Sequence, residues 1–384
     1  MGTMRLEPTR VQAWAVRSAG AIWKAFDVQM VIYALLLAII GLLMAYTNSG
    51  STPLSAGTTF TRALVWLALA IVAFAVVAAF DYRWLKTFAW PLYFANIALL
   101  VGSLVLGDGV GGVARWVTVF GLQFQFSEIA KILMIVVLSN WIASRPAQRM
   151  GRPWTIVGGG LLVAPAMVLV LMQPDLGTSL VFVAILAGTL FLSGASVRWM
   201  ALFGAIGLAA MPFIWNVVLR DYQKQRLTSF LDPATDPLGS GYQLVQSRIA
   251  VGSGGLFGKG ITNGTQNQLD FLPVQTTDFV YAILAEELGF IGGVLVLGLF
   301  VALLWRVLLA GWRAEDPFAL AFSAGMASMI IFQVLVNVGM VIGIMPITGI
   351  PLPFVTHGGA SLISIAVGLG ILQSINLRQI RPRW

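Results

Sequence analysis

The amino-acid sequence predicts an all-α polytopic membrane protein, with about ten transmembrane helices and a long ordered extracytoplasmic loop between spans 7 and 8. Its 384 residues are 58% hydrophobic and only 10% charged, and the mean hydropathy is +0.88. Soluble domains do not reach such values. Apolar runs long enough to cross a bilayer recur along the chain. One polar interruption, 220–276, is far longer than an ordinary connection.

Each expected span is an apolar run of about 20 residues, the length that crosses the hydrocarbon core of a bilayer. In chain order the expected spans are 28–47, 61–80, 87–107, 127–144, 154–172, 176–195, 198–219, 278–305, 316–343 and 354–376. An even number of spans places both ends of the chain on one side of the membrane. The expected parts are an N-terminal segment 1–27, a single ten-span domain 28–376 that includes the loop 220–276, and a tail 377–384.

Basic residues indicate the orientation of the bundle. The short segments on the side of the two termini carry many Lys and Arg residues, such as Arg83, Lys86 and Arg145, whereas the short loops on the other side carry few. This asymmetry is the positive-inside pattern, so both terminal segments are expected in the cytoplasm. Because topology explains the net charge of +8, no nucleic-acid partner is predicted.

Cysteine is absent, and histidine occurs once, as His357. These counts exclude disulfides, thiolate catalysis and metal sites built from Cys and His, so no protein-bound metal site is predicted. His357 lies in "MPITGIPLPFVTHGGASL" (345–362), where closely spaced prolines keep the chain extended before the last span. Irregular backbone at membrane depth is tolerated only against protein or a water-filled cavity. We expect the lone histidine to be a hydrogen-bonded packing residue rather than a ligand.

The loop 220–276 mixes aromatic, aliphatic and turn-forming residues, which predicts an ordered surface loop with short helices. Within it, "GSGGLFGKG" (252–260) resembles a phosphate-binding loop. A Walker A motif requires Ser or Thr after its lysine, and here Gly260 follows Lys259. Two interpretations stay open: backbone amides that cradle a phosphate, or a plain flexible connector.

Two polar motifs occur on the side opposite the termini. In "QFSEIAK", Ser127 is a good helix N-cap, and Glu128 and Lys131 have the i,i+3 spacing at which helical side chains meet. The pair is either a helix-start pair with a snorkelling lysine, or a cation that Glu128 orients at the mouth of a cavity to receive an anionic substrate. In "QPDLGTS", Asp175 is either the cap of the next span or a functional residue.

Three acidic residues mark the start of span 8, in "TTDFVYAILAEELGF". Thr276 and Thr277 are N-cap candidates, so Asp278 falls in the first helical turn, where the helix dipole favours an ionised carboxylate. In a continuous helix Glu286 would lie about 12 Å deeper than Asp278, and Glu286 and Glu287 would point about 100° apart. We expect these two glutamates to have structural or hydrogen-bonding roles.

Several of these motifs occur together in one known family. The most specific stretches are "RLTSFLDPATDPLGSGYQLVQSRIAVGSGGLFGKG" (226–260), "GTQNQLDFLPVQTTDFVYAILAEELGFIG" (264–292) and "PITGIPLPFVTHGGASL" (346–362). With "QFSEIAK" and "QPDLGTS", they make the chain resemble the SEDS proteins (shape, elongation, division and sporulation) over nearly its whole length. "GTQNQLDFLP" is more similar to the elongation branch, which maintains rod shape, than to the division branch. The resemblance implies a ten-span peptidoglycan glycosyltransferase of the bacterial cytoplasmic membrane, which polymerises lipid II on the outer face together with a class B penicillin-binding protein.

The resemblance also implies roles for individual residues. The aspartate of the family's "TDF" motif, here Asp278, is its catalytic residue, and Glu128, Lys131 and Asp175 match residues that line its central cavity. A sugar diphosphate leaves as an anion without protonation, so an inverting transferase requires a base for the acceptor hydroxyl and cations for the developing charge. Asp278 fits the base. The basic residues that fit the cations are Arg115, Lys131, Arg226, Arg248 and Lys259. No cofactor has a ligand signature, although a divalent cation (Mg²⁺ or Mn²⁺) on the diphosphate is compatible with this chemistry.

Other functions stay open at this point. A transporter that flips the same lipid would also carry acids and a polar cavity inside the membrane. It would need polar residues along its whole path, whereas here they gather on the outer half. A division-specific polymerase is the nearer alternative within the family. A pure scaffold for cell-wall enzymes would leave the charged outer cluster without a purpose.

Overall fold

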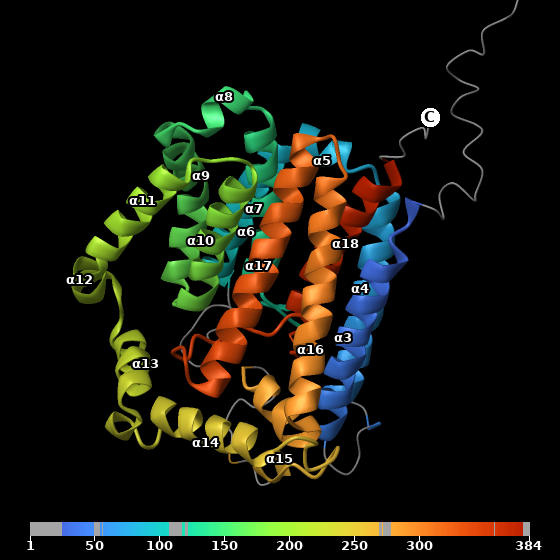
Figure 1. The fold of residues 1–384 in the computed structure, drawn as a ribbon, viewed down its shortest axis with the longest axis vertical. Coiled ribbons are helices and arrows are strands. Elements are labelled where there is room, and N and C mark those ends of the chain that lie inside the picture. Colours follow the sequence, from blue (N-terminus) through green and yellow to red (C-terminus); the bar gives the residue numbers. More distant parts are fainter. Residues whose placement is uncertain are drawn as a thin grey trace, which may run out of the picture.

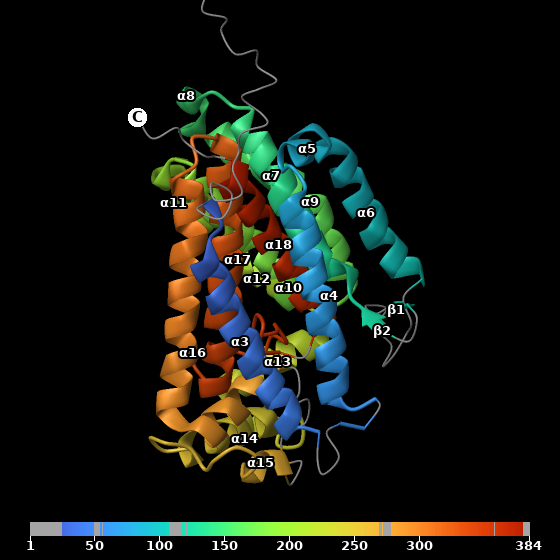
Figure 2. The same ribbon diagram turned by 90° about the vertical axis from the view of Figure 1, so that its right-hand side faces the viewer.

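Long apolar helices make up most of the described chain. The computed structural model describes residues 25–49, 54–55, 57–106, 117–119, 122–268, 271, 278–356 and 358–378. The long helices lie side by side along one axis (Figure 1). The described chain begins and ends at the same end of this bundle, which we call the terminus end. The opposite end, where residues 221–268 lie, is the loop end (Figures 1 and 2).

Within the described residues, eight helices are long and apolar enough to cross a membrane, and two shorter apolar helices bring the set to ten. Their positions match the ten predicted spans, and the predicted all-α polytopic fold is confirmed. In chain order they are α3 (Val28–Thr47), α4 (Thr59–Ala79), α6 (Ala89–Leu106), α7 (Phe126–Ala143), α9 (Pro153–Met172), α10 (Leu176–Leu192), α11 (Val197–Ala209) with its continuation to residue 218, α16 (Val280–Trp312), α17 (Pro317–Ile342) and α18 (Gly359–Arg378).

Short elements connect these helices. At the terminus end they are α5 (Arg83–Thr87) and α8 (Ala147–Met150). Strands β1 (Val117–Val119) and β2 (Leu122–Phe124) form an antiparallel pair that precedes α7. The remaining short elements are α12 (Met211–Phe213), the π-helical turn η2 (Ile214–Val218), α13 (Asp221–Leu231), the 3₁₀ turn η3 (Pro233–Thr235), α14 (Ser240–Ser253) and α15 (Thr265–Gln268). The helices α13 to α15 confirm that the long loop, in its described part 220–268, is ordered around short helices.

Short polar side chains begin several of the spanning helices. Each accepts a hydrogen bond from a backbone amide of the first turn, which satisfies one of the donors that a helix start leaves unpaired. The four residues are Asp27 for α3, Thr58 for α4, Asp175 for α10 and Asp316 for α17. Caps of this kind fix where apolar helices of similar composition begin.

Burial separates a central group of helices from a peripheral one. The most apolar windows of α17 and α18 are 72% buried and that of α7 is 67% buried, whereas the helical segment 197–218 is not buried at all. This segment, which contains α11, stands at the edge of the bundle (Figure 1). Because α7, α17 and α18 are surrounded by protein, their polar residues face other side chains rather than lipid.

Three ion pairs join the helices at the terminus end. Each pair connects two segments that are far apart in the sequence, and the contacts are charge-assisted hydrogen bonds or close ion pairs. They are Arg306–Asp27 between α16 and α3 (2.7 Å), Lys86–Asp316 between α5 and α17 (2.9 Å) and Arg378–Asp81 between α18 and the α4–α5 turn (3.5 Å). The terminus end is therefore held together by side chains that satisfy one another.

The prediction of a continuous helix at 278–305 is wrong. Gly289 has φ 69° and ψ −169°, so α16 consists of a short helix before Gly289 and a long one after it, which continues to Trp312. Asp278 lies two residues before the first helical residue, and the N-cap is Phe279. Glu286 is consequently not buried along a spanning helix. It lies against the loop residues 253–266.

The chain between α17 and α18 is irregular and folds back into the bundle. Its residues Ile350 and Leu352 are buried, and the Nδ2 group of Asn337 donates to the carbonyl oxygen of Ile350 (2.8 Å). This confirms the expectation that the proline-rich segment packs against protein. The last span begins at Gly359, later than the predicted residue 354. His357 lies outside the described residues.

Candidate active site

Three segments that are distant in the sequence meet at the loop end. They are the turn between α9 and α10, which carries Asp175, the helix α13, which carries Arg226, and the irregular segment 346–348. Together they line a cavity of about 40 Å³, whose charged lining residues are Asp175 and Arg226. A space of this size holds only a few water molecules. Asp175 and Arg226 are both predicted from the sequence as candidate site residues, but nothing in the sequence indicates that they would be neighbours.

Asp278 lies next to Gly349, the residue that follows the cavity-lining Thr348. The Oδ2 atom of Asp278 is 3.3 Å, and the Nη1 atom of Arg226 is 3.7 Å, from the point that a Cβ atom on Gly349 would occupy. A carboxylate and a guanidinium therefore face the same small space, which a side chain at position 349 would fill. The φ of Gly349 is 74°, a conformation that favours glycine.

Asn337 of α17 fixes the backbone at Asp278. Its Nδ2 group donates both to the carbonyl oxygen of Asp278 (3.0 Å) and to that of Ile350 (2.8 Å). One buried amide thus ties the start of the short helix of α16 to the irregular segment before α18. Asn337 is not among the residues predicted from the sequence, although a signal is present: Gln333 and Asn337 are polar residues one helical turn apart in an apolar span.

Asp175 is both a helix cap and a wall of the cavity. Its Oδ1 atom accepts from the amide of Thr178 (3.0 Å), and its Oδ2 atom accepts from the Thr178 hydroxyl (3.0 Å) and from Gln125 Nε2 (3.1 Å). The two interpretations of Asp175 are therefore compatible. Its contact with Gln125 also joins the start of α10 to the start of α7.

Glu128 and Lys131 form a buried ion pair inside α7. Lys131 Nζ is 2.7 Å from Glu128 Oε1, and the side chains are 1% and 3% exposed. The snorkelling interpretation is wrong, because the ammonium group ends on Glu128 within the bundle. The expected N-cap Ser127 is also wrong, since the cap is Gln125 and Ser127 lies inside the first turn. Within the described residues, Glu128 Oε2 and Ser127 Oγ have no hydrogen-bond partner, so this buried region retains capacity to bind a polar ligand.

Two of the predicted substrate-binding cations have other contacts. Arg248 donates from Nη2 to the carbonyl oxygen of Gly343, the C-cap of α17 (2.8 Å). Lys259 Nζ lies 2.7 Å from Glu286 Oε1 and 2.9 Å from Thr265 Oγ1. The structure therefore does not gather every basic residue of the loop around Asp278. Arg115 lies outside the described residues, and its role stays a prediction.

The glycine-rich stretch 252–260 is not arranged as a phosphate cradle. The amides of Lys259 and Gly260 donate to the carbonyl oxygens of Glu286 and Glu287 (2.9 and 3.0 Å). These two donors are therefore used within the protein. The alternative of a plain flexible connector is also wrong, because this stretch is bonded to both sides of the break in α16.

A divalent cation would find few protein ligands at this site. Among the described residues there is no group of three His, Cys, Asp or Glu side chains that could hold a metal ion. Asp175 is the carboxylate that lines the cavity with Arg226, and Asp278 lies beside Gly349. An ion would therefore have to complete its coordination with oxygen atoms of the substrate and water, as Mg²⁺ commonly does on phosphates.

Comparison with known proteins identifies the family. Residues 27–380 match the family of cell cycle proteins that comprises FtsW, RodA and SpoVE. The chain belongs to this family. The resemblance to the SEDS proteins that the sequence motifs indicated is thereby confirmed.

Relatives within the FtsW, RodA and SpoVE family align over most of their length. The peptidoglycan glycosyltransferase MrdB of Escherichia coli is 40% identical, over 82% of this chain and 85% of that protein. The peptidoglycan glycosyltransferase RodA of Treponema pallidum is 31% identical, over 92% and 98%. The stage V sporulation protein E of Bacillus subtilis is 37% identical, over 91% and 96%.

Solved structures share the fold of this family member. A chain from a structure described as "Structural coordination of polymerization and crosslinking by a peptidoglycan synthase complex" superposes with a TM-score of 0.76 at 32% identity, over 92% of this chain and 99% of that chain. The rod shape determining protein RodA of Thermus thermophilus superposes with a TM-score of 0.68 at 28% identity, over 92% and 97%. The family member described here is therefore a multi-pass membrane protein with a RodA-like fold.

Proposed function

We propose that this protein polymerises lipid II into glycan strands, as the peptidoglycan glycosyltransferase of cell elongation and rod-shape maintenance. The enzyme class predicted from the sequence is confirmed by the relatives, which are named peptidoglycan glycosyltransferases MrdB and RodA. The observation that supports the chemistry is that Asp278 and Arg226 face one small space beside Gly349 at the loop end.

Asp278 acts as the general base in this proposal. Its carboxylate accepts the proton of the acceptor sugar's 4-hydroxyl while that oxygen bonds to the anomeric carbon of the donor sugar. The bond from this carbon to the diphosphate breaks, the configuration inverts, and the lipid diphosphate leaves as an anion. A glycosidase needs a second carboxyl group to protonate its leaving oxygen. A diphosphate does not, so one carboxylate is sufficient.

Cations at the site stabilise the leaving group. Arg226 has a planar guanidinium group whose donor geometry fits phosphate oxygens. Arg226 lies beside Gly349, as does Asp278. If the anomeric carbon of the donor sugar faces Asp278, the diphosphate attached to that carbon is within reach of Arg226. Lys131 of α7, whose ammonium group contacts Glu128, supplies a second positive charge within the bundle. A Mg²⁺ or Mn²⁺ ion, when bound, would neutralise further charge on the diphosphate.

The cavity must open before it admits substrate. At about 40 Å³ it is far too small for a lipid-linked disaccharide. The wall that can move without breaking the bundle is α13, because it belongs to the loop between α11 and α16. We propose that a class B penicillin-binding protein binds at the loop end and favours the open form. This assignment is supported by the similarity to a chain of a peptidoglycan synthase complex.

The same proposal orients the protein in its membrane. The positive-inside pattern assigns the terminus end to the cytoplasm, so the loop end faces outward. Lipid II would then be used on the outer face of the bacterial cytoplasmic membrane, with both termini inside. Membrane lipid surrounds the bundle along α11, whose residues are not buried.

A flippase of the same lipid is the competing function. It would require polar groups that are accessible from one end of the bundle to the other. At the terminus end, the described acids Asp27, Asp81 and Asp316 are instead engaged in ion pairs between helices. This asymmetry favours an enzyme that works at the loop end.

One experiment separates these functions. Purified protein is incubated with fluorescent lipid II, with and without its class B penicillin-binding protein, and the products are resolved on a gel by chain length. We expect glycan polymer that increases with the partner. Transfer of intact lipid II across a vesicle membrane without any polymer would support the flippase and contradict the proposal.

A further inference from the structure

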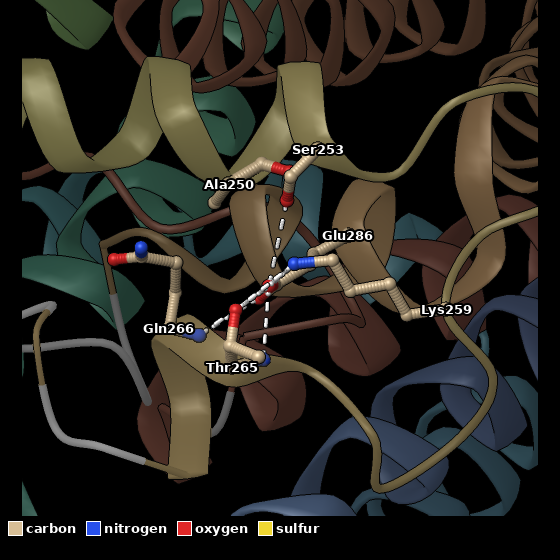
Figure 3. Close-up of polar contacts among 6 residues, drawn as sticks. All are labelled: Ala250, Ser253, Lys259, Thr265, Gln266 and Glu286. Atoms are coloured by element: carbon tan, nitrogen blue, oxygen red, sulfur yellow. Dashed lines mark hydrogen bonds and ion pairs between the residues drawn. The ribbon is translucent and has the colours of Figure 1, made fainter.

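Glu286 is a fully buried carboxylate that the proposed mechanism does not use. Its side chain is 0% exposed. Figure 3 shows it at the centre of a cluster with residues of α14, α15 and the connection between them. Its Oε1 atom accepts from Lys259 Nζ (2.7 Å), the Thr265 amide (2.9 Å) and the Thr265 hydroxyl (3.0 Å). The amide of Gln266 lies 3.3 Å from each carboxylate oxygen.

Beside this cluster, backbone hydrogen bonds from the loop satisfy the two helix ends that meet at the break in α16. A helix end leaves carbonyl oxygens unpaired and a helix start leaves amides unpaired. Here the loop supplies partners on both sides of Gly289. The four bonds are Lys259 N to Glu286 O (2.9 Å), Gly260 N to Glu287 O (3.0 Å), Phe290 N to Gly255 O (2.9 Å) and Ile291 N to Leu256 O (3.2 Å). The loop therefore replaces the hydrogen bonds that a continuous helix would have made.

Glycine makes this close approach sterically possible. A Cβ atom on Gly258 would lie 2.1 Å from the carbonyl oxygen of Glu287, and the φ of Gly258 is 80°. A Cβ atom on Gly289 would lie 2.3 Å from the amide nitrogen of Gly258. The glycines that made 252–260 resemble a phosphate loop are thus explained by contact with α16.

We infer that Glu286 and Lys259 form a positioning latch for Asp278. The inference rests on the proposed function, since it assigns Asp278 the role of base. The short helix 280–288 begins two residues after Asp278 and is held at both ends. Asn337 bonds the backbone at Asp278, and the latch bonds the helix at Glu286. Release of the latch lets the helix turn about Asn337, which displaces the carboxylate of Asp278 from Arg226.

This inference changes the role of Lys259 from substrate binding to positioning. A lysine that bound the diphosphate would have to leave Glu286. That carboxylate would then be buried without its cation, which is strongly unfavourable. With its Nζ group shared between Glu286 and Thr265 and its side chain 28% exposed, Lys259 is better placed to neutralise Glu286. Glu286 and Lys259 act on the reaction only through the position of Asp278.

Steady-state polymerisation of lipid II by the complex with its class B penicillin-binding protein tests the latch. The variants are Lys259→Met, Lys259→Arg, Glu286→Gln and the double variant Lys259→Met/Glu286→Gln. We expect Lys259→Met and Glu286→Gln each to lower kcat about tenfold with little change in KM, because substrate contacts are intact. The double variant should have a kcat no lower than that of the more impaired single variant, because the two single substitutions break the same ion pair. Lys259→Arg should restore most of kcat.

Lys224→Met is the matched control. Lys224 lies in the same loop and is 4.0 Å from the fully exposed Asp221, so its removal should leave kcat unchanged. The latch is overturned if Lys259→Met raises KM about tenfold at unchanged kcat, the result expected of a substrate-binding cation. Additive losses in the double variant would also overturn it. If Glu286→Gln does not fold, Lys259→Met and Lys259→Arg still test the latch. Lys259 is partly exposed, so substitutions there are better tolerated by the fold.

Hydrogen exchange separates failure of the latch from failure of the proposed function. In Glu286→Gln, amides of 254–266 and 280–291 should exchange faster than in wild type, whether or not the protein polymerises lipid II. If the wild-type complex makes no polymer but this change is seen, the proposed function fails and the latch contact stands. If the wild type polymerises and Lys259→Met has normal kcat and normal exchange, the latch fails and the function stands.

Discussion

The two ends of the helix bundle use the same residue types for different purposes. At the terminus end, acids and bases from distant helices pair with one another, as Asp27 does with Arg306 and Asp316 with Lys86. At the loop end, Asp278 and Arg226 face the same small space beside Gly349, and Glu128 and Lys131 form a buried pair within one helix. The terminus end is thus arranged to hold helices together, and the loop end to retain polar groups for a ligand.

The comparison shows why a charged residue in a membrane protein does not identify a site by itself. Asp27 is nearly buried and so is Glu128. Arg306 meets Asp27 with two nitrogens, which satisfies both carboxylate oxygens. Glu128 keeps one oxygen without a hydrogen-bond partner among the described residues. The capacity that remains after internal hydrogen bonding, rather than burial, distinguishes these two carboxylates.

The largest expected effect is at Asp278. The variant Asp278→Asn keeps the shape of the side chain and removes the base, so polymerisation should fall by about 10³-fold or more. The protein should still insert and still bind its partner. Glycan chain formation on a gel, with co-purification of the partner, measures both. Polymer made at a near wild-type rate would show that Asp278 is not the base and that the loop end lacks the chemistry assigned to it.

The next effect is expected at Lys131. The variant Lys131→Met should lower lipid II turnover about 100-fold by removing a cation from the site. Its effect on thermal stability should be smaller than its effect on turnover. Turnover per folded molecule and the melting temperature are measured together. Loss of folding with intact activity per folded molecule would place Lys131 with the structural pairs of the terminus end.

The opposite outcome is expected at Asp27. The variant Asp27→Asn removes the charge from a largely buried pair with Arg306, which should cost about 3 kcal/mol of stability, whereas an asparagine oxygen still caps α3. Polymerisation per folded molecule should stay near wild type. Thermal unfolding and the lipid II assay on the same preparation check this. A strong loss of turnover at unchanged melting temperature would mean that the terminus end also takes part in the reaction.

The smallest effect concerns activation by the partner. Activity of the isolated protein should be low and should rise on complex formation, as the loop 220–276 shifts toward its open form. Proline fixes φ near −65°, but Gly255 has a φ of 57°, so Gly255→Pro should distort the loop. We expect a severalfold weaker activation with unchanged catalysis by the partner itself.

Hydrogen exchange across the described part of that loop, with and without the partner, is the direct measurement. Protection that stays the same while activation is complete would show that the partner acts by another route. Changed protection confined to the terminus end would reverse the distinction between the two ends.

Much of this protein follows from the sequence alone. The number and order of the spans follow from apolar runs, because a bilayer permits few ways to satisfy backbone polar groups. The family follows from motifs such as "QFSEIAK", "QPDLGTS" and "TTDFVYAILAEELGF". Asp278 and Asp175 are candidates because they stand in the "TDF" and "QPD" motifs to which the resemblance assigns roles.

Only the tertiary structure decided what each charge contacts. The break at Gly289, the use of Lys259 by Glu286, and the placement of Arg226 beside Asp278 depend on segments that are far apart in the sequence. The composition of one segment does not reveal which distant segment will approach it. An exposed loop lysine and a lysine that neutralises a buried carboxylate have the same sequence signature. The hydrogen bonds that distinguish them form only when the loop packs against the broken helix.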